Sequence, residues 1–146
     1  MKVIVWEDGY SDAVKIFYPC LSAKRKDESE DEFYQRMVVK LGVSATVIDV
    51  DDIPKERATR DGWKLDGGSV KLDRDRAIRK RANRLLEKAT DKKLQLVASV
   101  LANDTSENRK KLKDHKDITD QLYSNPYPVF DDVATESIMF YEPKEF

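Results

Sequence analysis

Short blocks of apolar residues in the first 73 positions predict strands joined by tight turns. Residues 2–6 and 13–18 are rich in β-branched and aromatic side chains, and Asp8-Gly9 between them is a typical hairpin turn. A linking strand is expected over residues 45–50. A second hairpin is expected around Asp66-Gly67-Gly68, which is not a phosphate-binding loop because no Lys-Ser or Lys-Thr pair follows it.

One helix is expected within this first part of the chain. Apolar residues between Phe33 and Leu41 recur at helical spacing. Ser29 and Glu32 have the spacing of a capping box at its start, and Gly42 suits the position just after its end. We expect Trp63 to anchor the small core. Together these signals predict an α+β head domain of two β-hairpins and a helix over residues 1–73.

Residues 74–123 have the pattern of an antiparallel helical hairpin. Asp73 suits the N-cap of a first helix, which has no Gly or Pro up to Ala102. The apolar stripe changes register at Thr90-Asp91, so this segment is expected to form either one kinked helix or two. Asp104 and Glu107 form the cap signature of a further helix. The stripe of the first segment consists of Ile78, Ala82, Leu85, Ala89, Leu94, Val97 and Leu101.

The last segment, residues 124–146, is expected to be an extended C-terminal arm. Three prolines exclude a long helix there, and its aromatic residues argue against disorder. We expect a second chain to bury its large apolar side chains, so deletion of residues 125–146 should leave a folded protein that no longer joins its complex. The expected partner-binding residues of the arm are Phe130, Ile138, Phe140 and Tyr141.

Charge is abundant and segregated. Charged residues make up 38% of the 146, yet the net charge is only −1. It divides into −3 over residues 1–73, +8 over 74–116 and −6 over 117–146. The basic helix over residues 74–93 is expected to be solvated or to face another subunit, with Arg79, Arg81 and Arg84 toward acidic groups or solvent. The alternative is a nucleic-acid-binding module, although no aromatic residue stands among the cations for base stacking.

Few residues suggest catalysis or metal binding. We expect Cys20 to be a small buried side chain and His115 to be a solvated helix residue. The carboxylates Asp49, Asp51 and Asp52 lack the glycine and terminal glutamate of a calcium loop, and Asp52-Ile53-Pro54 has the form of a turn. A hydrolase that uses such a carboxylate cluster is the weakest alternative. The sequence therefore predicts no enzyme, no cofactor and no metal site.

Residues Ile53 to Asp73 carry a degenerate pattern: a proline, a basic residue, the core Arg60-Asp61-Gly62-Trp63 and a short hairpin. It continues into Asp73-Arg74-Asp75-Arg76-Ala77, and Lys2-Val3-Ile4-Val5 and Ile16-Phe17-Tyr18-Pro19 belong to it as well. Over about residues 1–90 the chain resembles small proteins of the tail region of tailed bacteriophages and prophages, some of them similar to tail-fibre assembly proteins.

The resemblance implies a non-enzymatic phage protein, either a structural component of the virion tail region or a tail assembly factor. Its partners would be other phage structural proteins or further copies of itself. It would lie in the host cytoplasm during assembly and in the virion afterwards. No apolar run approaches the roughly 20 residues of a membrane span, and the N-terminus soon becomes acidic, so neither a transmembrane helix nor a signal peptide is expected.

Overall fold

The computed structural model describes residues 1–146 and divides the chain into two compact units, Met1–Asp73 and Arg74–Phe146. Both helices and antiparallel sheets are present, so the predicted α+β class is confirmed. The division after Asp73 coincides with the end of the predicted head. Residues 124–146, which we expected to form a separate arm, belong to the same compact unit as the two helices before them.

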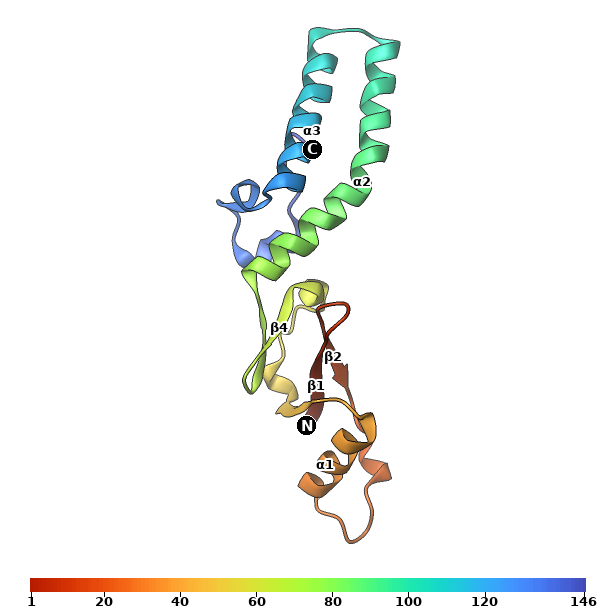
Figure 1. Cartoon of the computed structure of the whole chain (residues 1–146), viewed down its shortest axis with the longest axis vertical. Helices are drawn as coiled ribbons and strands as arrows, with labels where there is room; N and C mark the ends of the chain where they lie inside the picture. Colours follow the sequence, from red (N-terminus) through yellow and green to blue (C-terminus); the bar gives the residue numbers. More distant parts are fainter. The chain divides into compact units, whose positions relative to one another are not determined.

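The first unit is built on a three-stranded antiparallel sheet in the order β2-β1-β3 (Figure 1). The strands are β1 (Lys2–Asp8), β2 (Ala13–Phe17) and β3 (Thr46–Asp49). The central strand β1 is apolar on both faces, because successive side chains of a strand point to opposite sides. Ile4 packs on one face with Phe33 and Tyr34 of α1 (Glu30–Leu41), whereas Val3 and Val5 face the opposite core.

The hairpin of β4 (Trp63–Asp66) and β5 (Ser69–Leu72) supplies that opposite core. Trp63 is completely buried there, and Val70 packs in the same cluster. The six-residue 3-10 helix Arg57–Gly62 lies before β4 and contributes Thr59, whose hydroxyl accepts a hydrogen bond from the Trp63 indole N–H at 3.0 Å. The expected role of Trp63 as a buried anchor therefore agrees with its position.

Local capping explains where α1 begins and ends. The Ser29 hydroxyl accepts from the Glu32 backbone N–H at 3.2 Å, and the Glu32 carboxylate accepts from the Ser29 N–H at 2.8 Å. This reciprocal pair is the predicted capping box. Gly42 follows the helix with φ of 68°, a left-handed conformation that glycine adopts without a Cβ penalty.

The second unit consists of two antiparallel helices and a folded C-terminal segment (Figure 1). Of the two alternatives for the first helix, the structure has one, α2 (Arg74–Ala102), which bends along its length. It is followed by α3 (Ser106–Ser124), whose N-cap is Thr105 rather than the predicted Asp104. No helix in the chain combines the length and the apolar character that a bilayer span needs.

Candidate interaction surface

The C-terminal segment, residues 124–146, folds against the two helices and is not extended. It contains two short 3-10 helices, Tyr127–Phe130 and Thr135–Phe140; the first packs against α3 and the second against α2. Prolines exclude a long helix, as predicted, but they are compatible with such short turns. The expectation of an extended arm is therefore wrong.

Two arginines of α2 hold this segment in place through hydrogen bonds to its backbone. Arg74 donates to the backbone carbonyls of Val133 at 2.7 Å and Phe130 at 2.8 Å. Arg81 donates through Nε to the Tyr141 carbonyl at 2.7 Å. Backbone carbonyls outside regular structure need such donors when they are covered. Two of the basic residues of α2 thus bind the chain's own C-terminal segment.

The aromatic residues of the segment differ in their accessibility. Phe130 and Ile138 are fully buried in the unit, and Tyr141 is half-buried with its ring edge-on to that of Phe130. Of the four apolar residues expected to bind a partner, only Phe140, at 57%, is largely exposed. The sequence indicated that these side chains need burial, but the covering surface comes from the same chain, so Phe130 and Ile138 are not available to a partner.

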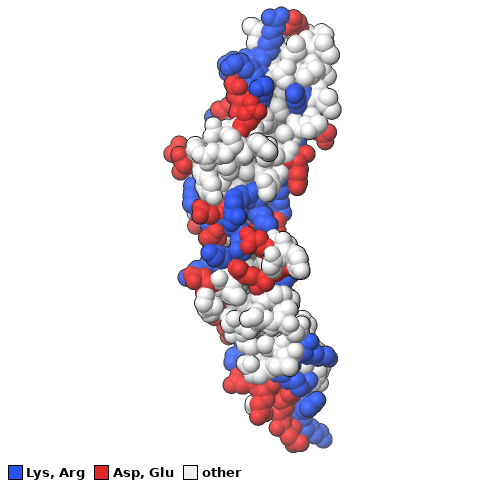
Figure 2. All heavy atoms as spheres, in the orientation of Figure 1, with Lys and Arg blue, Asp and Glu red and all other residues white.

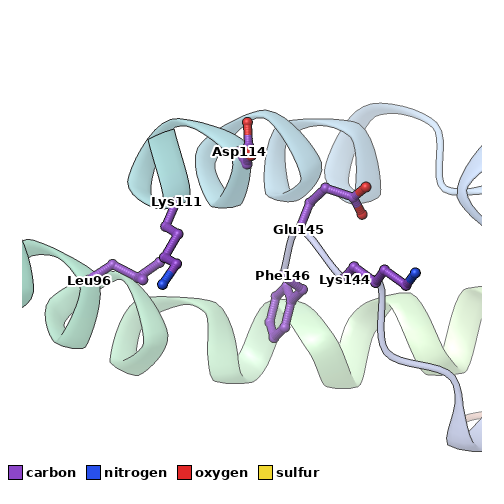
Figure 3. A pocket seen from close by; sticks show the side chains of 6 residues that line it. All are labelled: Leu96, Lys111, Asp114, Lys144, Glu145 and Phe146. Atoms are coloured by element: carbon purple, nitrogen blue, oxygen red, sulfur yellow. The ribbon is translucent and has the colours of Figure 1, made fainter. Parts of the chain in front are cut away.

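The last residues lie between α2 and α3 (Figure 3). The Phe146 ring packs on His115, with ring centroids 5.1 Å apart, and the Lys92 ammonium lies 4.5 Å from the centre of the Phe146 ring. Lys92 also pairs with Glu142 at 2.5 Å, and this hydrogen bond lowers the pKa of the Glu142 carboxyl. The C-terminal segment therefore completes the contact between the two helices.

His115 is buried, with 1% of its surface exposed, and the expectation of a solvated helix residue is wrong. Its Nδ1 lies 2.8 Å from the Phe146 carbonyl oxygen and its Nε2 lies 3.1 Å from that of Ala89. Both ring nitrogens therefore face backbone oxygens. His115 joins both helices to the end of the C-terminal segment, which is a structural role.

Arg79 and Arg84 are exposed, whereas Arg81 is turned inward to Tyr141. The three arginines predicted to act together therefore do not share one outward surface. Phosphate binding by the helix would have to use the exposed cations alone.

Charged residues also dominate the outer side of α3. Lysine–aspartate pairs four residues apart follow the helix, for example Lys113 with Asp117 at 3.1 Å and Lys116 with Asp120 at 3.0 Å. Arg109 forms a two-pronged contact with Asp104 at 2.5 and 2.6 Å, and this bonding lowers the pKa of the Asp104 carboxyl. Such compensated pairs are typical of a solvated helix surface.

The C-terminal end of α2 carries two largely exposed leucines. Leu94 is 64% exposed and Leu101 is 82% exposed, and Val97 and Ala98 lie between them on the same side of the helix. Figure 2 shows mostly neutral atoms over this end of α2, with Lys and Arg over α3. We call these four residues the distal stripe. Two exposed leucines on one side of a helix make this surface a candidate for protein contacts.

The other candidate chemical groups do not form a site. Cys20 is exposed rather than buried; its Sγ lies 2.9 Å from the Ser22 hydroxyl, which lowers the pKa of the thiol. The Asp49 carboxylate accepts from the Asp51 backbone N–H at 3.0 Å, a capping role within a turn. No three His, Cys, Asp or Glu residues converge as metal ligands.

The change of helix register in the sequence is also a signal for the distal stripe. The apolar positions up to Ala89 keep a spacing of three or four residues, and the next one, Leu94, comes five residues later. At about 100° per residue, that interval moves the stripe to another side of α2. The register change therefore marks where the apolar residues leave the interior of the unit.

No family model matches this chain, and neither the curated proteins nor the solved structures contain a significant match to it.

Proposed function

We propose that this chain is a non-enzymatic bacteriophage protein that acts through protein–protein contacts, as a component of the virion tail region or as a tail assembly factor. The observation that carries the proposal is the distal stripe, where Leu94 and Leu101 lie in water on an otherwise charged helical hairpin. Burying a leucine side chain contributes about 1.5–3 kcal/mol, so this surface favours association. The phage setting rests on the sequence resemblance over residues 1–90.

The distribution of cations supports protein contacts over nucleic acid. Arg74, Arg81 and Lys92 bind the C-terminal segment, and the lysines of α3 are paired with carboxylates of the same helix. A phosphate backbone would have to compete with these contacts. The proposed location is the host cytoplasm during assembly and the virion afterwards.

Complementation in the phage or prophage that encodes the chain tests the proposal. The double variant Leu94→Ser/Leu101→Ser should fold, because both side chains are exposed, but should reduce the yield of tailed particles. Gln95→Ala/Ser99→Ala on the same two turns is the matched control. Mass spectrometry of purified particles then separates a virion component from an assembly factor, since only the former remains in them.

Two outcomes would contradict the proposal. Wild-type particle yield from the stripe variant would show that the stripe has no role in assembly. A steep, salt-dependent shift of DNA or RNA by the purified chain, abolished by Arg79→Glu/Arg84→Glu with assembly intact, would favour the nucleic-acid alternative.

A further inference from the structure

A groove with an apolar floor and a cationic rim lies between α2 and α3. It has a volume of about 300 Å³, and carbon atoms make up nearly all of its surface. Long cationic side chains line such a groove with their methylene stems and keep their charged ends in water. The residues that line it are the half-buried Leu112 and four cations: Lys93 of α2 and Arg109, Lys113 and Lys116 of α3. No carboxylate is among them.

The groove adjoins the distal stripe. Val97 and Leu101 follow Lys93 by four and eight residues. At 100° per residue, each of these steps moves only about 40° around α2, so both side chains lie next to Lys93 on the helix surface. The apolar surface therefore continues from the floor of the groove onto the exposed end of α2.

The cations of the rim have room for a further carboxylate. Lys93 is exposed and forms no ion pair. Lys113 and Lys116 each pair with one aspartate of α3, and their side chains remain largely exposed. An ammonium group has three donors, and exposed pairs of this kind contribute little to stability. A carboxylate from outside the chain can therefore join these contacts.

Floor and rim together define the chemistry of an occupant. An apolar side chain fits the floor, and carboxylates on either side of it complement the charge of the rim. No aromatic side chain lines the groove for base stacking. We propose that this groove binds an acidic amphipathic segment of a partner protein, with an apolar side chain between α2 and α3 and Asp or Glu side chains at the rim. The inference rests on the proposed function for the protein-binding role of this end of the unit, and it adds the chemistry of the partner.

Fluorescence anisotropy with the full-length chain and a labelled helical peptide, which has leucines on one face and glutamates beside them, tests this inference. We expect binding that weakens as the salt concentration rises. Lys93→Glu/Lys113→Glu should weaken it at least about tenfold, because two attractive charge pairs become repulsive. Lys88→Glu/Lys111→Glu changes the net charge equally at exposed positions outside the groove and should bind like the unmodified chain. Circular dichroism verifies that all variants fold.

A peptide with lysines in place of the glutamates provides the converse test. It should bind the Lys93→Glu/Lys113→Glu chain more tightly than the unmodified chain. Equal affinity of the unmodified chain for both peptides, or equal losses in the groove variant and its control, would overturn the inference. Duplex DNA that binds more tightly than the acidic peptide, and loses this binding in the groove variant, would also overturn it and would favour the nucleic-acid alternative.

Particle assembly separates this inference from the proposed function. Lys93→Glu/Lys113→Glu should reduce the yield of tailed particles, as Leu94→Ser/Leu101→Ser should, whereas Lys88→Glu/Lys111→Glu should not. A reduced yield from the stripe variant together with wild-type yield from the groove variant would overturn the acidic partner and leave the proposed function standing.

Discussion

Trp63 is the largest fully buried side chain of the first unit. Its ring is fully buried, and its indole N–H is satisfied by Thr59. Trp63→Ala removes this ring from the core and should lower the free energy of unfolding by about 3–5 kcal/mol in urea titrations. Tyr10→Ala, at a completely exposed position, is the control and should change it very little. Equal stability of the two variants would contradict the role of Trp63 as an anchor.

The ion pair of Glu28 and Arg36 predicts a dependence of stability on pH. Arg36 donates to both carboxylate oxygens, at 2.6 and 2.8 Å, and this bonding lowers the pKa of Glu28 from 4.5 to about 2. A carboxyl whose pKa is lowered by folding stabilises the protein above its ordinary pKa. That contribution disappears as the pH falls from 4.5 toward 2.

Glu28→Gln should therefore reduce the melting temperature at pH 7, and the difference from the unmodified chain should shrink as the pH falls toward 2. Thermal melts at a series of pH values measure it. Asp27→Asn changes a neighbouring exposed carboxylate and is the control. A difference that stays constant from pH 7 to pH 2 would show that the ion pair does not stabilise the fold.

Single residues were predictable from the sequence where size alone decides their position. Trp63, a large ring between two turn signals, was expected in the core and lies there. Cys20 and His115 were placed wrongly because the burial of small or polar residues depends on which distant segment reaches them. His115 is covered by Phe146, which is 31 residues away in the sequence, and no local pattern indicates that contact.

Among the elements, those with local start and stop signals were predicted well. The hairpin turns, the capping box of α1 and Gly42 after that helix depend on neighbours within four residues. The structure of the C-terminal segment was not predicted, because its two 3-10 helices are held by tertiary contacts from Arg74 and Arg81. Short helices of this kind have little stability of their own, so sequence pattern alone does not specify them.

The C-terminal segment should respond to the loss of His115. His115→Ala removes a buried ring that contacts Phe146 and leaves two carbonyl contacts unmade, so we expect a loss of about 1–3 kcal/mol in stability. Amide hydrogens of residues 140–146 should exchange markedly faster in this variant, as hydrogen-exchange mass spectrometry measures. Lys113→Ala, on the exposed side of the same helix, is the control. Unchanged protection of residues 140–146 would show that His115 does not fasten them.

At the scale of the whole molecule, the basic segment and the acidic C-terminal segment lie in the same compact unit. Residues 74–116 carry +8 and residues 117–146 carry −6, and the structure joins both in Arg74–Phe146 with a net charge of only +2. The asymmetry that suggested an acidic neighbour is therefore mostly compensated inside the chain. This compensation removes much of the charge argument for a phosphate-binding partner and agrees with the proposed role of the exposed leucines at the end of α2.

Two compact units with separate cores should fold separately. Fragment 1–73 should show the circular dichroism of a mixed α+β fold, and fragment 74–146 that of a helical fold. Each should unfold in a cooperative thermal transition, because each buries its own apolar residues. Each fragment has 73 residues, a size at which a single core gives only marginal stability, so both transitions should lie at moderate temperature. The decisive comparison is fragment 74–123, which lacks the C-terminal segment that we first expected to be dispensable. Removing Phe130, Ile138 and Met139 exposes their contacts on α2 and α3, at about 1.5–3 kcal/mol for each side chain, a sum comparable with the whole stability of a small domain. Fragment 74–123 should therefore lose its cooperative transition while 74–146 keeps it. If fragments 74–123 and 74–146 both unfold cooperatively at the same temperature, residues 124–146 add nothing to the stability of the fold. The segment would then again be expected to act as an arm that binds a partner.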